Sequence, residues 1–421
     1  MLSVGSFAQD NEYVEEVVSI GTRGKPRSVS SSPVPVDVLS AEDISKTGTD
    51  DLLMQLQGSI PSLNVHLQPI SDAASMIRPA NLRGLSADST LITTNGKRRH
   101  HASVIAFQGG GVNDGSQGAD ISVIPAIALK RVEVLRDGAS AQYGSDAIAG
   151  VINFVLDDIS EGGSLSYKMG EYTEGDGATS TIAGKFGMPL GQDGFVTTSF
   201  QIRQADDTSR SLQRPDAAAL IAAGNTAVAN PAQIWGAPKI DDDVTFFMNA
   251  GVTNSDGSES YMFGNYSERD VDGGFYYRNP DGRSGVFTIG DYRAVGNVDG
   301  TCAYGTGASG QVDPSNYVTR DAIMADPSCF LMNEIAPGGY TPRFVGTITD
   351  TSFTTGRRGE ITDGFLSGYS FDVSGSVGRN EADFGLNNTV NPSMGPDTPR
   401  NFTTGSYIEL EKTFNFDLQK Q

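Results

Sequence analysis

The sequence predicts a compact α+β domain followed by antiparallel strands of a transmembrane β-barrel. The chain has 51 glycines among its 421 residues, a proportion that is typical of turn-rich β structure. After residue 156, long segments alternate apolar and polar side chains, so each strand has one lipid face and one water face. The connections alternate between short turns and long loops, as they do in transmembrane barrels.

The overall composition excludes several classes of protein. Mean hydropathy is −0.26, and no run of about 18 apolar residues occurs, which excludes a transmembrane helix. The net charge of −21 argues against a nucleic-acid partner, because phosphate backbones require patches of Lys and Arg. No zinc motif, nucleophile elbow or carboxylate pair stands in a matching context. The sequence therefore predicts no enzyme activity, no cofactor and no metal site.

The start of the chain combines a cleavage signal with a short β-branched segment. Residues 6–8, followed by Gln9, resemble a signal-peptidase site without its charged and apolar regions. We therefore expect residues 1–8 to be the remnant of a longer signal peptide. Residues 11–24 mix acidic and β-branched residues, and such a run can add as a strand to a partner's sheet edge. Residues 25–35, rich in Ser and Pro, read as a linker.

The residue pattern of 36–158 is typical of a small α+β domain. Val36 begins a short alternating strand, and Thr49 is the predicted N-cap of a helix that carries leucines on one face. Residues 91–94 form a predicted strand that runs into Asn95-Gly96, a hairpin signal. Residues 131–156 predict a strand, a loop of small residues and a second, apolar strand.

Beyond residue 158 the pattern changes to two-faced strands. The predicted outward apolar set is Leu165, Tyr167, Met169, Ile182, Phe186, Met188, Val196, Phe200, Ile202, Phe371, Val373 and Val377. Short turns at 190–194, 253–258 and 358–364 alternate with long loops at 205–243, 269–343 and 381–401, the first of which is expected to hold a helix near 215–229. A soluble β-sandwich also has two-faced strands, but it needs no such alternation of loops. The barrel is therefore favoured.

Four segments in order carry a resemblance to a known family. They are EEVVSIG at 15–21, NLRGL at 81–85, NGKR at 95–98 and RVEVLRDGASAQYGSDAIAGVINFVL at 131–156. Together, over about 140 residues, they resemble the TonB-dependent outer-membrane receptors. The resemblance implies a TonB box and linker in residues 9–35, a plug domain in 36–158, and part of an outer-membrane barrel with extracellular loops in 159–421.

The resemblance also implies a function and a location. Such receptors import nutrients across the outer membrane of Gram-negative bacteria, driven by the proton-motive force through TonB and its inner-membrane complex. The expected ligand is a ferric siderophore or similar chelate, and an oligosaccharide is the second candidate. Both stay open because the fold itself does not select the substrate. The alternative is a secreted or surface β-rich binding protein, such as an adhesin, which transports nothing and needs no TonB.

The resemblance assigns roles to two groups of residues. The TonB-coupling residues are Glu15, Glu16, Val17, Val18, Ser19 and Ile20. Arg83 and Arg136 occupy plug positions that form salt bridges to barrel glutamates in the family. Buried charge pairs of this kind would hold a plug in a pore.

One basic run stands out in this acidic chain. It consists of Lys97, Arg98, Arg99, His100 and His101, and Gln108 follows at the start of a glycine-rich stretch. In the family, apical plug loops face the extracellular mouth, so these residues are candidates for binding an anionic ligand. The alternative is the solvated end of a hairpin.

Two further features concern the second half of the chain. About eight strands fit residues 159–421, whereas plugged transporters have about 22, so we expect the sequence to be a fragment cut inside the barrel. Cys302 and Cys329 are its two cysteines. A disulfide between them would close a loop of about 28 residues, contribute roughly 3–4 kcal/mol and indicate an oxidising compartment. The alternative is two unrelated free thiols.

Overall fold

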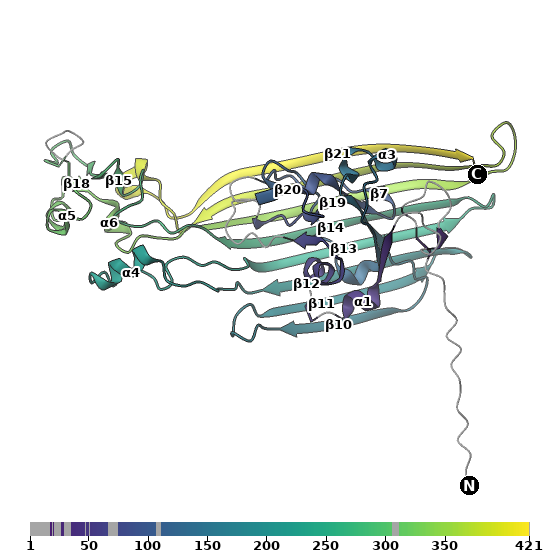
Figure 1. Cartoon of the computed structure of the whole chain (residues 1–421), viewed down its shortest axis with the longest axis horizontal. Coiled ribbons are helices and arrows are strands. Elements are labelled where there is room, and N and C mark those ends of the chain that lie inside the picture. Colours follow the sequence, from purple (N-terminus) through teal and green to yellow (C-terminus); the bar gives the residue numbers. More distant parts are fainter. Residues whose placement is uncertain are drawn as a thin grey trace, which may run out of the picture.

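A computed structural model describes residues 17–18, 20, 27–28, 35–46, 48–49, 51–65, 75–106, 111–304 and 311–420 (Figure 1). A small N-terminal domain, residues 36–156, lies against one face of a large antiparallel sheet, residues 163–420. The long loops of that sheet extend together from one of its ends, at the left of Figure 1.

The N-terminal domain contains a five-stranded mixed sheet in the order β3-β8-β9-β6-β7. Its strands are β3 (Val36–Ser40), β8 (Leu129–Leu135), β9 (Gly150–Leu156), β6 (Thr90–Thr94) and β7 (Lys97–Arg98). Only β6 and β9 run parallel among the described pairs. The other elements are β4 (Leu63–Val65) paired with β5 (Ala80–Leu82), the helices α1 (Ala41–Ser45), α2 (Leu52–Ser59) and α3 (Ser140–Tyr143), and 3-10 turns at Ala87–Ser89, Gly111–Asn113, Ala126–Ala128 and Ser145–Ala147.

Local sequence explains most of these elements. Asn95 (φ 49°) and Gly96 (φ 77°) are both left-handed, which is the backbone of the predicted two-residue hairpin turn. Gly150 (φ 151°) is required because a Cβ there would lie 2.2 Å from the carbonyl oxygen of Leu135. The predicted N-cap was wrong by two residues: Asp51 caps α2 by accepting from the Met54 amide, and Thr49 instead accepts from the Asp51 amide at 3.2 Å.

The large sheet has eight strands in sequence order, each antiparallel to its neighbours. They are β10 (Gly163–Gly170), β11 (Thr179–Pro189), β12 (Gly194–Ala205), β13 (Lys239–Thr253), β14 (Glu259–Gly274), β19 (Arg343–Ile361), β20 (Tyr369–Asn387) and β21 (Phe402–Lys420). Among the described residues β10 and β21 do not pair, so the sheet is open.

The two faces of the sheet differ as the alternation predicts. Apolar side chains on the outer face are exposed, for example Leu165 at 70%, Met169 at 73% and Phe414 at 74%. The inner face is mainly polar and is buried where the N-terminal domain covers it. Phe247 and Phe263 are apolar exceptions that join the core of that domain. The prediction of an α+β domain followed by antiparallel two-faced strands is confirmed.

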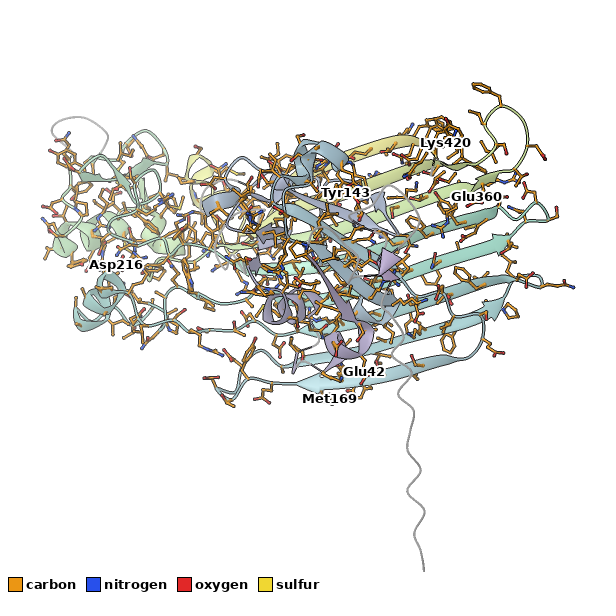
Figure 2. All side chains as sticks on the ribbon, turned by 45° about the vertical axis from the view of Figure 1, so that its right-hand side comes forward. Glu42, Tyr143, Met169, Asp216, Glu360 and Lys420 are labelled. Atoms are coloured by element: carbon orange, nitrogen blue, oxygen red, sulfur yellow. A yellow bond between two sulfur atoms is a disulfide. The ribbon has the colours of Figure 1, made fainter. Side chains whose placement is uncertain are left out.

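Connections of the two lengths lie at opposite ends of the sheet, except that the short connection 171–178 between β10 and β11 lies at the end of the long loops. Figure 2 shows Asp216, in one long loop, at the end opposite to Glu360 and Lys420. The long loops span 206–238, 275–342 and 388–401, and the short turns span 190–193, 254–258 and 362–368. The long loops hold α4 (Pro215–Ala222), β15 (Thr288–Ile289), β16 (Tyr292–Arg293), β17 (Gly296–Asn297), α5 (Tyr317–Met324), β18 (Cys329–Phe330), α6 (Met332–Ile335) and a 3-10 segment at Pro392–Asp397.

The second long loop has an apolar core of its own and a disulfide. Cys302 and Cys329 are joined, with their Cα atoms 5.0 Å apart. Cys329 packs with Val312, Ile323 and Leu331 in a small buried cluster. The loop is therefore a folded unit. In the ranges that the structure describes, every helix is too short or too polar to span a membrane.

Candidate functional site

The basic run at residues 97–101 lies against the inner face of the large sheet. Lys97 Nζ is 2.9 Å from Asp372 Oδ2 on β20, and Arg99 Nη2 donates to Asp350 Oδ1 on β19 at 2.6 Å. The His101 amide donates to Glu411 Oε1 on β21 at 2.9 Å. The hairpin after β6 thus connects the N-terminal domain to three neighbouring strands.

Asp350 is the centre of this contact. It accepts from Arg99, and its Oδ2 accepts from His100 Nε2 at 2.9 Å. Asn265 Nδ2 donates to Oδ1 at 2.8 Å and Asn380 Nδ2 donates to Oδ2 at 3.0 Å. The side chains of Asp350, Arg99 and His100 are only 2%, 3% and 4% exposed. A carboxylate buried this deeply is stable only because it is paired and fully hydrogen-bonded.

A glycine on β20 makes the close approach of His100 feasible. A Cβ on Gly378 would lie 2.2 Å from His100 Nδ1 and 2.3 Å from its Cγ. Ser103 extends the contact, because its amide and hydroxyl donate to Asn380 Oδ1 at 2.8 and 2.9 Å. We call Lys97, Arg99, His100, His101 and Ser103, with these partners on β14 and β19–β21, the anchoring cluster.

A second polar contact joins the domain to β14 and β11. Arg269 on β14 donates to Asp120 Oδ2 at 3.2 Å, to the Met76 carbonyl at 2.6 Å and to Ser122 Oγ. Arg269 and Asp120 are both buried. On β11, Lys185 pairs with Asp157.

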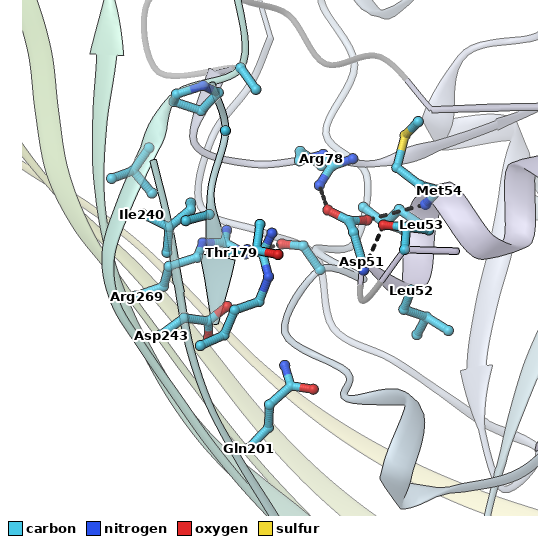
Figure 3. A pocket seen from close by; sticks show the side chains of 18 of the residues that line it. Asp51, Leu52, Leu53, Met54, Arg78, Thr179, Gln201, Ile240, Asp243 and Arg269 are labelled. Atoms are coloured by element: carbon cyan, nitrogen blue, oxygen red, sulfur yellow. Dashed lines mark hydrogen bonds and ion pairs between the residues drawn. The ribbon is translucent and has the colours of Figure 1, made fainter. Parts of the chain in front are cut away.

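A cavity of about 150 Å³ lies between the N-terminal domain and strands β11–β14 (Figure 3). Asp51, paired with Arg78, borders it from the domain side. Gln201, Asp243 and Arg269 border it from the strands. Beside the anchoring cluster the corresponding space is only about 20 Å³.

A third cavity, of about 450 Å³, lies among the three long loops. Its lining includes Tyr277, Tyr340, Arg343 and Arg400. The Arg400 guanidinium lies over the Tyr340 ring, with its Cζ 5.4 Å from the ring centroid. Burial raises the pKa of Tyr277 to about 12, so its phenol stays protonated and donates to the Gly338 carbonyl at 2.7 Å.

Most of the basic run is buried in this structure, and its binding of a ligand stays a prediction. Lys97, Arg99 and His100 are buried against carboxylates of the sheet, and Arg98 pairs with Asp146 inside the domain. The physical reason is charge pairing: the inner face of β19–β21 presents carboxylates that the hairpin meets directly. Arg98 and His101 are the part-exposed members of the predicted patch, and Gln108 lies outside the described residues.

The two predicted anchoring arginines pair within the N-terminal domain in the part of the chain that the structure describes. Arg83 lies 3.7 Å from Asp137, and Arg136 pairs with Asp37 on β3. Their contact with barrel glutamates stays a prediction. The contacts with the sheet that the structure describes include those of residues 97–103, Asp120 and Asp157.

The predicted coupling segment is only partly described. Val17–Val18 form β1, which pairs antiparallel with β2 (Arg27–Ser28). Ile20 is buried and belongs to a cluster with Val36, Leu91 and Leu135. Glu15, Glu16 and Ser19 lie outside the described residues.

Sequence reasoning missed the sheet side of the anchoring cluster. Asp350, Asn265 and Asn380 stand at inward positions of strands otherwise rich in Ser and Thr. A carboxylate or amide at such a position is the signal that could have indicated an inward contact. Gly378 gave no comparable signal, because an isolated strand glycine has many explanations.

The contact between His101 and Glu411 predicts a pH-dependent attachment. The hydrogen bond to Glu411 raises the pKa of His101 above its ordinary value of 6.5, against the opposing effect of burial. The stabilising contribution is therefore complete below about pH 6.5 and is lost as pH rises through the raised pKa. We expect the melting temperature of the detergent-solubilised protein to fall over this range, and His101→Gln to flatten the fall. Equal slopes for both proteins would contradict the assignment.

Comparison with known proteins shows what the first part of the chain is similar to. Residues 28–151 match the TonB-dependent receptor plug domain. An iron-regulated outer membrane virulence protein of Vibrio cholerae is 29% identical over 156 residues, covering 37% of this chain and 22% of the relative. A ferric enterobactin receptor of Pseudomonas aeruginosa is 32% identical over 120 residues, covering 28% of this chain and 16% of the relative. The chain thus matches about a fifth of the length of these curated relatives.

Solved structures extend the likeness beyond the plug. A crystal structure of a ferric enterobactin receptor from Pseudomonas aeruginosa superposes with a TM-score of 0.53 at 16% identity, covering 92% of this chain and 46% of that one. This likeness shows the fold: a plug domain followed by antiparallel barrel strands. The two curated relatives are named as an outer membrane protein and as a ferric enterobactin receptor. Residues 28–151 thus match the TonB-dependent receptor plug domain, and the chain is similar in this domain and in the strands that follow it to receptors of that kind.

Proposed function

We propose that this chain supplies the plug and eight strands of the barrel wall of a receptor that imports ferric siderophores with energy delivered by TonB. The wall is the large sheet, strands β10–β14 and β19–β21. The observation that carries the proposal is the N-terminal domain, held by buried charge pairs on the polar face of a sheet whose other face is apolar. A domain in this position blocks the polar side of the wall and must rearrange before a solute can pass.

The strength of this attachment supports a need for external energy. Removing one partner from a buried charge pair costs about 3–5 kcal/mol. Arg99–Asp350 and Arg269–Asp120 are two such pairs, and several further hydrogen bonds cross the same interface. Opening the interface would therefore use up much of the binding free energy of a ligand with a micromolar Kd, which is about 8 kcal/mol. Mechanical work applied through TonB would supply the difference.

The proposed binding segment for TonB is residues 15–20. An extended segment pairs with a partner's sheet edge through its backbone amides and carbonyls. In the structure β1 uses this capacity on β2. TonB would take the place of β2 and pull on the chain that leads into the plug.

The proposed substrate class follows from the relatives and from the outer loops. Two of the relatives are named as ferric enterobactin receptors. The cavity among the long loops offers tyrosine rings and arginine guanidinium groups. Such groups contact planar aromatic ligands and anions.

Val17→Pro tests the coupling. Proline removes a backbone donor and blocks strand pairing, so we expect uptake of radiolabelled ferric siderophore to be lost while its binding to the cell surface is kept. Ser32→Pro, in the linker that already contains prolines, is the matched control and should retain uptake. Binding without any uptake in the unaltered protein would favour the adhesin instead. Unchanged uptake by the Val17→Pro variant would show that residues 15–20 do not couple to TonB.

A further inference from the structure

The plug (the N-terminal domain, residues 36–156) meets the wall on two sides that are packed very differently. Toward β19–β21 the anchoring cluster leaves a space of only about 20 Å³, which is room for about one water molecule. Toward β11–β14 the cavity measures about 150 Å³, which is room for several waters. The attachment is therefore asymmetric.

The chemistry of the larger cavity indicates that water fills it. Arg78 and Arg269 border it, and within the described part of the chain Arg78 Nε, Arg78 Nη2 and Arg269 Nε are buried without a hydrogen-bond partner, against Arg99 Nε alone among the side chains of the anchoring cluster. Buried donors of this kind are normally satisfied by ordered water when the space is polar and large enough. Asp51 and Asp243 supply carboxylates to the same cavity.

The two sides would differ in the work needed to separate them. Parting the anchoring cluster exposes Asp350, Arg99 and His100 together from a contact that has room for about one water molecule. At the cavity, water already reaches the facing groups, so widening it adds solvent to surfaces that are partly hydrated. On this side Arg269, which pairs with Asp120, itself lines the cavity, so water can follow when that pair separates.

From this asymmetry, and resting on the proposed transport function, we infer that the plug opens by widening the hydrated cavity along β11–β14, while the anchoring cluster stays closed as the pivot. The resting cavity is far smaller than the roughly 300–1,000 Å³ of typical ligand pockets. The substrate therefore passes only after this side has widened.

Single cysteines placed on the two sides test the inference. Gln201→Cys puts a thiol on β12 at the cavity, and Thr354→Cys puts one on β19 at the inner face beside the anchoring cluster. The two cysteines in the sequence are joined to each other, so they give no background labelling. Thr179→Cys, which also borders the cavity, is the substitute if the Gln201 variant does not reach the outer membrane.

The measurement is the rate of reaction with a charged methanethiosulfonate in cells that are taking up a ferric siderophore, with and without a protonophore. We expect the rate at residue 201 to rise severalfold during energised uptake and the rate at residue 354 to stay constant. A rise at residue 354 alone, at both positions, or at neither while uptake proceeds would overturn the inference. If the unaltered protein takes up none of a panel of ferric siderophores, the proposed function fails instead.

Discussion

Replacing Asp350 with alanine is expected to detach the plug from β19–β21 and to lower the free energy of unfolding by about 3–5 kcal/mol. The change leaves the Arg99 guanidinium and the His100 imidazole buried without their acceptor. It also removes the acceptor of Asn265 and Asn380, so four donors lose a partner together. Thermal unfolding of the purified protein measures the loss.

The functional readout of the same variant is leakage through the wall. Cells that produce the Asp350→Ala protein should become sensitive to large hydrophilic antibiotics, because a loosened plug no longer seals the polar face. Asp363→Ala is the matched control: this aspartate is exposed in the short turn after β19, and its loss should change neither property. Equal stability of the two variants would show that Asp350 does not hold the plug.

Replacing Gly378 with alanine is expected to displace the His100 ring and to cost about 1–3 kcal/mol. The added methyl group would lie 2.2 Å from Nδ1 of that ring, and both partners belong to well-packed elements. Gly375→Ala is a stringent control, because Gly375 lies on the same strand and its Cβ would meet nothing within 4 Å. The two variants share the change in backbone entropy, so their difference in melting temperature isolates the clash.

A second substitution separates this clash from a general effect on β20. His100→Ala removes the ring and should itself be destabilising, yet it makes room for a methyl group at residue 378. In a double-mutant cycle the two changes should therefore cost less together than the sum of the single changes. Strict additivity would mean that Gly378 and His100 do not contact each other.

Local patterns in the sequence determined most of the secondary structure. Alternation along residues 163–205 and 369–387 predicted the strands and their outer face, because a strand's side chains point to opposite faces in turn. Asn95-Gly96 predicted a tight hairpin through its backbone preferences alone. The N-cap was misplaced between Thr49 and Asp51 because both side chains are suited to capping and only the hydrogen bond to Met54 decides.

The tertiary structure decided what the basic run does. The local sequence of residues 97–101 is compatible with contact with a ligand, with solvent or with carboxylates of a neighbouring sheet. Arg99 and Asp350 are 251 positions apart in the chain, and no local pattern relates two residues at that distance. A strand's alternation shows which of its side chains share a face, but the residue that meets each of them depends on how separate elements pack. The sequence by itself therefore determined the strands of the sheet and the hairpin after β6. Tertiary packing decided that this hairpin contacts β19–β21.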